Sequence, residues 1–305
     1  MMRRTVLIIL IVFVWLGTPH DIFGEDLLLD LGPEDLVQAN GVAIDVFGYS
    51  VPSLADWNND GLQDLIIGEG GGYEAAKVRV YLNVGTESNP EFSKPTYAQS
   101  NGIDLTCPAS GCMGCFPRIV YWDADARKDL LIGQAEGKVK LFLNIGTDEK
   151  PMFDAGTFLQ VGQTDKKEDI DVGSRATPSL VDWNNDGKRD LIVGAYDARI
   201  YIFINEGTNT EPDFIAATFA QTDGKDLLVP SGRASPVIAD LDGDGRKDIL
   251  AGNTDGELLF YSNVGTDAEP NFSSYQRVEA GGTAIDLAST ARSRPAICYW
   301  TGEGY

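Results

Sequence analysis

The chain has 305 residues, of which 43% are hydrophobic and 23% charged, a composition typical of a globular protein with a sizeable core. Asp and Glu outnumber Lys and Arg by 46 to 24, so the net charge is −22 at pH 7. A chain this acidic repels phosphate backbones, which argues against a nucleic-acid partner. Acidic side chains that cluster would instead favour bound cations.

The N-terminus has the pattern of a secretory signal peptide. A short basic head, Met1 to Arg4, precedes an apolar run from Thr5 to Leu16, which is shorter than the roughly 20 residues that span a bilayer. We expect cleavage after Gly24, so that residues 1–24 are removed and no membrane span remains; the alternative is an uncleaved anchor. The expected location is secreted, at the cell surface or periplasmic.

The single histidine, His20, lies in this leader. Its removal would exclude Ser-His-Asp and Cys-His catalysis, histidine-ligated zinc and c-type haem. No other group of residues suggests a catalytic site, so we expect the chain not to be an enzyme.

Two motifs recur along the chain at a nearly constant interval. Asn-x-Gly-Thr, followed by Pro-x-Phe, begins at Asn83, Asn144, Asn205 and Asn263, with spacings of 61, 61 and 58 residues. A second motif, typified by Pro-Ser-Leu-Val-Asp-Trp, begins at Pro52, Pro117, Pro178, Pro236 and Pro295. A repeat of this length indicates stacked supersecondary units.

Each unit reads as four short strands. In the first unit these are a small apolar run after Pro52, the buried run Leu65–Gly68, the alternating run Val78–Leu82 and a strand that begins near Phe92. The pattern predicts an all-β fold, a β-propeller of four-stranded blades. The expected blades are residues 50–110, 111–170, 171–228 and 229–288, with a partial unit at 289–305 and a leading strand near 36–46. We expect an incomplete ring; the alternative is a five-bladed form that borrows its N-terminal strand.

An acid-rich loop separates the first and second strands of each unit. In three units it has oxygen-bearing side chains at positions 1, 3, 5 and 9, a glycine at position 6, and a residue at position 7 that can offer its backbone carbonyl. Calcium suits this donor set, and we expect about three sites; an EF-hand is excluded because position 12 lies inside a strand. The alternative is that Asp, Asn and Gly simply form a turn. The predicted ligands are Asp56, Asn58, Asp60, Leu62 and Asp64; Asp182, Asn184, Asp186, Lys188 and Asp190; and Asp240, Asp242, Asp244, Arg246 and Asp248.

The corresponding loop of the second unit is degenerate. It keeps Asp123, Asp125 and Asp129, but position 1 is Tyr121 and position 6 is Ala126. We expect weak or absent calcium binding there. The fifth copy also begins with a tyrosine, Tyr299.

The two motifs in this order resemble the FG-GAP/VCBS repeat family over roughly residues 35–305. The resemblance implies blades like those of the integrin α-subunit propeller, with calcium in a hairpin loop on one face and ligand binding on the opposite face. It further implies an extracellular, adhesive protein; some members are lectins and some propellers belong to polysaccharide lyases. The loop acids carry over to this sequence, but Tyr121 and Tyr299 do not.

Other residues invite a functional and a structural interpretation. The tryptophans Trp57, Trp122, Trp183 and Trp300 could stack on sugars, but Leu241 in the same slot favours packing between blades. Cys107, Cys112 and Cys115 are candidates for a disulfide, with a thiolate metal site as the alternative, and Cys298 fits a buried thiol. Arg175, Arg233 and Arg292 recur three residues before the proline and could bind an anion, or each could pair with an acid such as Asp171 or Asp226.

These observations favour a secreted, calcium-binding module for an extracellular glycan or protein. The alternatives are the propeller of a polysaccharide lyase or hydrolase and a structural repeat of a larger surface protein.

Overall fold

The computed structural model describes residues 30–31, 36–72, 75–87, 89–123, 125–285 and 292–298. These residues form strands and turns, and no helix that could span a membrane occurs among them. The expected signal peptide and the fifth acidic loop lie outside the described residues.

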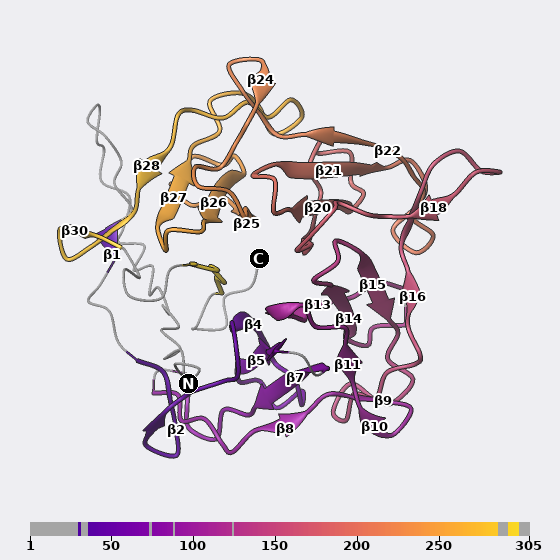
Figure 1. The fold of residues 1–305 in the computed structure, drawn as a ribbon, viewed down its shortest axis with the longest axis vertical. Coiled ribbons are helices and arrows are strands. Elements are labelled where there is room, and N and C mark those ends of the chain that lie inside the picture. Colours follow the sequence, from indigo (N-terminus) through magenta and orange to yellow (C-terminus); the bar gives the residue numbers. More distant parts are fainter. Residues whose placement is uncertain are drawn as a thin grey trace.

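Four antiparallel sheets are arranged as blades around a common axis (Figure 1), as the repeat predicts. The first strand of each blade lies nearest the middle of the ring and the fourth lies at the outside. Blade 1 contains β4 (Val51–Ala55), β5 (Asp64–Gly68), β7 (Ala76–Tyr81) and β8 (Thr96–Tyr97). Blade 2 contains β13 (Phe116–Val120), β14 (Asp129–Gly133), β15 (Val139–Phe142) and β16 (Thr157–Phe158). Blade 3 contains β19 (Thr177–Val181), β20 (Asp190–Gly194), β21 (Ile200–Asn205) and β22 (Phe214–Phe219). Blade 4 contains β25 (Ser235–Ala239), β26 (Asp248–Gly252), β27 (Leu258–Tyr261) and β28 (Gln276–Arg277).

The hydrophobic core lies between neighbouring blades. The second strand of every blade is buried along its whole length, because both of its faces are covered. One cluster combines Leu131 and Val139 of blade 2 with Leu191 and Val193 of blade 3. Each blade therefore buries its apolar faces only by stacking on its neighbours, as in other repeat folds.

A glycine ends each second strand because the next blade enters directly against it. A Cβ atom on Gly133 would lie 1.9 Å from the carbonyl oxygen of Ala176. The Ala176 amide in turn donates to the Gln134 carbonyl over 3.2 Å, which joins blade 3 to blade 2 near the axis. The equivalent glycines are Gly68, Gly194 and Gly252.

An outer hairpin follows each fourth strand and contacts the phenylalanine of the next blade. The hairpin β9–β10 (Gln99–Ser100 and Ile103–Asp104) holds blade 2 through a 2.8 Å bond from the Asn101 amide to the Phe153 carbonyl. In the hairpin β23–β24 (Gln221–Thr222 and Lys225–Asp226) the bond is reversed, because the Phe272 amide donates to the Gln221 carbonyl over 3.0 Å. The hairpin β17–β18 (Gln160–Val161 and Glu168–Asp169) makes the same contact as β9–β10, from the Gly162 amide to the Phe214 carbonyl. The N-terminal hairpin β2–β3 (Gln38–Ala39 and Val42–Ala43) contacts Phe92 of blade 1 in this way.

Residues from both ends of the described chain occupy the interval between blade 4 and blade 1. Strand β1 (Asp30–Leu31) pairs with β29 (Glu279–Ala280) of the hairpin completed by β30 (Thr283–Ala284), so Leu31 takes the place that phenylalanine has elsewhere. On the inner side, Ser293 donates its amide to Asn253 of blade 4, and Arg294 donates to the Ser50 carbonyl beside blade 1. The second and third strands of a fifth blade are not among the described residues.

The connection between blades 1 and 2 carries a disulfide. Cys107, in β11 (Thr106–Cys107), is bonded to Cys115, with 5.7 Å between the Cα atoms. The glycine-rich strand β6 (Gly70–Gly72) pairs with β12 (Gly111–Gly114) of this connection. The side chain of Cys112 lies outside the described residues. Cys298 packs beside the core of blade 1, and burial raises its pKa to about 12, which suits an inert thiol.

Candidate functional site

The acidic loops join the first and second strands of each blade and share one backbone conformation. In blade 1, φ is 58° at Asn59 and 89° at Gly61, and in blade 3 it is 59° at Asn185 and 84° at Gly187. Asparagine and glycine tolerate this left-handed region better than other residues. The loops therefore turn sharply at the glycine, as the sequence predicts, and also at the asparagine two residues before it.

The first aspartate holds the loop closed through backbone amides. In blade 1 the two carboxylate oxygens of Asp56 accept the amides of Asp60 and Gly61, at 3.1 and 2.8 Å. In blade 3, Asp182 accepts from Asp186 and Gly187 at 3.0 and 2.8 Å. The anion at position 1 thus stabilises the turn that brings position 5 beside it.

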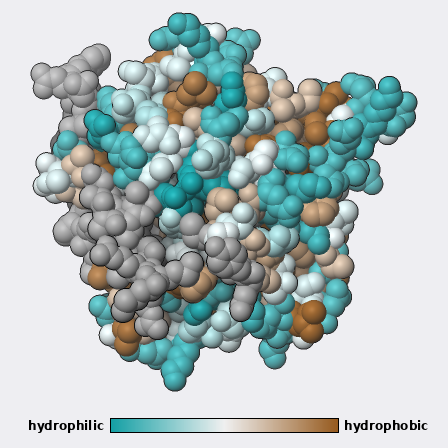
Figure 2. All heavy atoms as spheres, viewed as in Figure 1, coloured by the Kyte–Doolittle hydropathy of each residue, from teal (hydrophilic) through white to brown (hydrophobic). Residues whose placement is uncertain are grey.

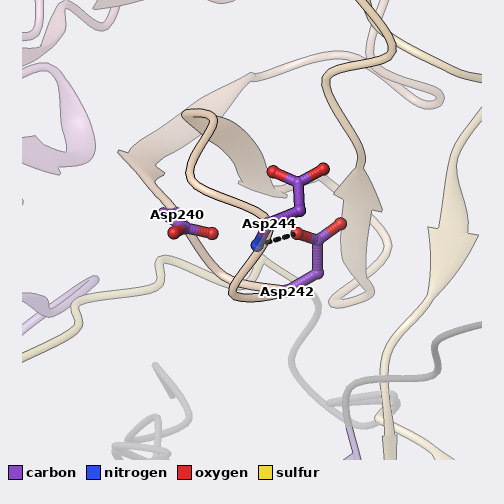
Figure 3. A group of neighbouring side chains, drawn as sticks. All are labelled: Asp240, Asp242 and Asp244. Atoms are coloured by element: carbon purple, nitrogen blue, oxygen red, sulfur yellow. Dashed lines mark hydrogen bonds between the residues drawn. The ribbon is translucent and has the colours of Figure 1, made fainter. Parts of the chain in front are cut away.

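Blade 4 brings three carboxylates together. One oxygen from each of Asp240, Asp242 and Asp244 lies within 4.8 Å of the other two, and Figure 3 shows all three side chains on the loop between β25 and β26. The Asp244 amide donates to Asp242 over 3.1 Å. Three anions this close repel one another, and a hard cation with oxygen ligands would offset that repulsion.

Blade 1 supports the same chemistry through an unsatisfied acceptor. The side-chain oxygen of Asn58 is buried and has no hydrogen-bond partner, whereas its amide nitrogen donates to Asp60 over 2.8 Å. A buried oxygen without a donor is costly unless a cation or water faces it. The donor set of carboxylate and amide oxygens fits calcium at this position.

The aspartate at position 9 has a second role that the ligand pattern alone does not show. Asp64 is fully buried, and its two oxygens accept the amides of Trp57 and Asn83 at 2.8 and 2.6 Å. Burial raises its pKa to about 6 although both backbone donors favour the anion. The same paired contacts occur at Asp129, Asp190 and Asp248. This carboxylate therefore joins the loop to the third strand in every blade, with or without a complete calcium pattern.

Position 7 differs between the blades in the charge it adds. The guanidinium of Arg246 bonds to Asp244, and the Lys188 ammonium lies 3.9 Å from Asp186. Blade 1 has Leu62 there, which adds no cation. An internal cation competes with a metal for the position 5 carboxylate, so the loop of blade 1 is the one least neutralised by its own side chains.

The loop of blade 2 keeps the fold of the others without their full set of anions. Ala126 adopts a φ of 61°, in the place of the usual glycine, and the Arg127 guanidinium bonds to Asp125. Arg189 of blade 3 donates to the backbone carbonyls of Tyr121 and Trp122. Basic side chains from two blades thus neutralise this loop.

The Asn-x-Gly-Thr motif is a turn closed by its own asparagine. The Asn83 side-chain oxygen accepts the amides of Gly85 and Glu91 at 3.0 and 3.1 Å. The side-chain oxygens of Asn144, Asn205 and Asn263 accept equivalent pairs of amides. The motif therefore stabilises the fold and offers no ligand atoms.

Trp57, Trp122 and Trp183 pack in the cores between blades, which confirms the structural interpretation for them, whereas Trp300 lies outside the described residues. The ring of Trp57 lies 5.8 Å from that of Phe153 in the next blade, and Trp183 lies 5.7 Å from Phe272. Both tryptophans are less than one-tenth exposed. They are unavailable for sugar stacking.

The recurrent arginines lie close together, but two of them do not pair with the acids that the sequence offers. Arg175 is 2% exposed, and neither Arg175 nor Arg233 forms an ion pair among the described residues. Asp226 pairs instead with Arg199, and Asp171 accepts the Gly173 amide. The pKa of Arg175 is lowered to about 8. Burial is the largest cause, and the positive charges of Arg294, Arg233 and Arg292 contribute to the same shift. Sequence reasoning missed Arg294, because it has no counterpart in phase with the other arginines.

Blades of this order around one axis, each with an acidic loop between its first two strands, define a β-propeller. Residues 182–251 match the FG-GAP-like repeat family. The chain is therefore a β-propeller, and its segment 182–251 matches the FG-GAP-like repeat model, as predicted.

No curated protein matches the sequence. Among solved structures, the chain is similar to the GH43_1 enzyme from Xanthomonas citri, with a TM-score of 0.41 and 11% identity over 82% of this chain and 91% of that one. It is also similar to the Tc holotoxin pore of Photorhabdus luminescens, with a TM-score of 0.36 and 13% identity over 81% of this chain. The match spans only 13% of the toxin chain. Similarity this low does not transfer a function.

Proposed function

We propose that the protein is a secreted, calcium-stabilised β-propeller that acts as a binding module for an extracellular glycan or protein. The observation that carries the proposal is the convergence of three carboxylates, from Asp240, Asp242 and Asp244, in a loop whose conformation recurs in phase around the ring. The unsatisfied Asn58 oxygen supports a second site of the same kind.

The residues that would hold calcium are those at positions 1, 3 and 5, with the position 7 carbonyl. Position 9 is committed to backbone amides, so it would contribute only a remaining lone pair. Calcium would neutralise mutually repelling anions and fix the loops that separate β4 from β5, β19 from β20 and β25 from β26. The proposed role of the metal is structural.

Secretion is supported by two independent features. The N-terminal pattern is that of a signal peptide, and the Cys107–Cys115 disulfide is of a kind that persists in oxidising compartments. N-terminal sequencing of the protein released by its native host would test cleavage after Gly24.

The calcium proposal is tested by melting and by stoichiometry. A ligand at a hundredfold its Kd adds about 2.7 kcal/mol per site to the free energy of unfolding, so excess chelator should lower the Tm of the calcium-loaded protein. In calorimetric titration, Asp56→Ala, Asp182→Ala and Asp240→Ala should each remove one bound calcium.

Asp123→Ala is the matched control, because it changes the same kind of loop in blade 2. It should remove no calcium, since Tyr121 stands where the other loops have their first carboxylate. A melt that chelator leaves unchanged would contradict the proposal. A glycan array with and without calcium would then identify the ligand class.

A further inference from the structure

Four arginines from successive parts of the ring gather near its axis. Arg175 precedes β19, Arg233 precedes β25, and Arg292 and Arg294 lie on the segment between blade 4 and blade 1. Arg294 shares the Phe116 ring with Arg175 and the Tyr49 ring with Arg292, and the charges of Arg294, Arg233 and Arg292 all reach Arg175. Figure 2 shows hydrophilic residues near the middle of the ring in the view of Figure 1. We call these four residues the central arginine cluster.

The backbone at three of these arginines has a conformation that glycine adopts with less strain than any other residue. The φ angles are 56° at Arg175, 61° at Arg233 and 115° at Arg292. Residues with side chains are strained in this region, and such strain concentrates at functional sites. Three successive units nevertheless place an arginine there, so the guanidinium serves a purpose that offsets the strain.

Aromatic rings hold the guanidinium groups of the cluster in place. The Arg175 and Arg294 guanidinium carbons lie 5.7 and 5.6 Å from the centre of the Phe116 ring. Arg292 and Arg294 share the Tyr49 ring at 4.1 and 5.0 Å. Cation–π contacts orient a guanidinium plane without using its hydrogen-bond donors. Such contacts leave the hydrogen-bond donors of Arg175 and Arg233 free for other partners.

Two members of the cluster have buried donors without acceptors. Among the described residues, the Nε and Nη1 atoms of Arg175 and the Nη1 atom of Arg233 are buried and have no hydrogen-bond partner. Arg175 is 2% exposed and forms no ion pair with the residues that the structure describes. A buried cation without an anion is strongly unfavourable. An anion at this point would relieve both the repulsion and the unpaired donors.

We propose that the central arginine cluster binds an oxyanion, a carboxylate or a sulfate, carried by an acidic sugar. Guanidinium forks match the geometry of these groups and bind them through paired hydrogen bonds. The surrounding protein has a net charge of −22, so the cluster is the place where an anionic ligand finds a favourable potential. This inference rests on the proposed binding function but not on the calcium sites.

The test is calorimetric titration of the full-length mature protein at low ionic strength, because salt screens such an interaction. The probes are galacturonate, sodium sulfate and neutral galactose, each with and without calcium. We expect galacturonate to bind and galactose not to bind. Binding of sulfate would show that the oxyanion alone is sufficient, and its failure would assign the site to carboxylates.

Arg175→Gln and Arg233→Gln should each weaken galacturonate binding about tenfold or more, because each removes charge-assisted hydrogen bonds. Arg199→Gln is the control, since Arg199 is partly exposed and pairs with Asp197 and Asp226. It should bind normally. If Arg175→Gln fails to fold, the galacturonate affinity of Arg233→Gln becomes the test, because Arg233 is only half-buried.

Calcium stoichiometry measured on the same variants separates this inference from the proposed function. Retained calcium with lost galacturonate binding is the expected result. The inference is overturned if neither anion binds, if galactose binds as tightly as galacturonate, or if both cluster variants keep full affinity. None of these outcomes would alter the effect of chelation on the Tm.

Discussion

Ala126 has a backbone conformation that the acidic loops of blades 1, 3 and 4 have at a glycine. Its φ of 61° lies in the left-handed region, where a Cβ atom is unfavourable. We expect Ala126→Gly to raise the free energy of unfolding by about 1 kcal/mol. Chemical denaturation in excess chelator measures this effect free of metal binding.

Gly187→Ala makes the reverse change at the equivalent position of blade 3. It should lower the free energy of unfolding by a similar amount under the same conditions. If Ala126→Gly instead destabilises the protein, the loop of blade 2 does not share the backbone of the others.

Asp129 tests whether the position 9 aspartate is needed without a metal. Its two oxygens accept the amides of Trp122 and Asn144 at 2.9 and 2.8 Å, inside a fully buried site. Asp129→Asn leaves one of those amides without an acceptor, which should cost about 2 kcal/mol. Thermal or urea unfolding measures the loss. Asp123→Asn, in the same loop but half-buried, should change stability by no more than about 0.5 kcal/mol.

At the scale of the blade, the glycine that ends each second strand sets the distance between neighbours. Gly133→Ala would place its Cβ 1.9 Å from the Ala176 carbonyl, so blade 3 must move away from blade 2. We expect a loss of at least about 3 kcal/mol, or failure to fold. Yield and urea denaturation are the measurements.

Gly102→Ala separates the clash from the general effect of adding a side chain. Gly102 has a φ of 81° and nothing within 4 Å of its Cβ position, so its substitution should cost only about 1 kcal/mol. Equal losses at Gly102 and Gly133 would show that close approach between blades is not what the second-strand glycine provides.

The elements of each blade could be predicted because the sequence repeats them in phase. The alternation at Val78–Leu82, the buried run at Leu65–Gly68 and the acidic loop each occur several times, so chance is excluded. The inner and outer contacts between blades were not predictable. Leu31 contacts the β29–β30 hairpin as the phenylalanines contact the other hairpins, but no Asn-x-Gly-Thr motif precedes it. The sequence around Leu31 therefore gives no sign of this contact.

In the candidate sites too, features set by local sequence could be predicted, and features that depend on contacts between distant residues could not. Loop positions 1 to 6 could be predicted because their oxygen atoms and glycine follow from the turn itself. The backbone role of Asp64 could not, because its partner Asn83 is 19 residues away and the pairing depends on sheet register. The pairing of Cys107 with Cys115 also depends on the fold, since the sequence allows several pairings.

At the scale of the whole molecule, Leu31 joins the start of the described chain to blade 4. It is 5% exposed and packs in one cluster with Leu250, Leu258 and Phe260. Leu31→Ala should lower the free energy of unfolding by about 2 to 4 kcal/mol. Urea denaturation in calcium measures this change, and Leu228→Ala is the control because Leu228 is 54% exposed. Equal stability of the two variants would show that this contact does not hold the N-terminal residues to blade 4.

The outer hairpins have a consequence for how the ring opens. Each hairpin is joined to the next blade by a backbone hydrogen bond, as from Asn101 to Phe153 and from Gly162 to Phe214. A blade therefore cannot separate without breaking a contact with its neighbour. The hairpin amides of different blades should therefore show similar protection from hydrogen exchange, because they become exposed together and not one blade at a time. Removal of calcium from one loop should then accelerate exchange at the hairpin amides of adjacent blades, and a disturbance in one unit would propagate along the circumference.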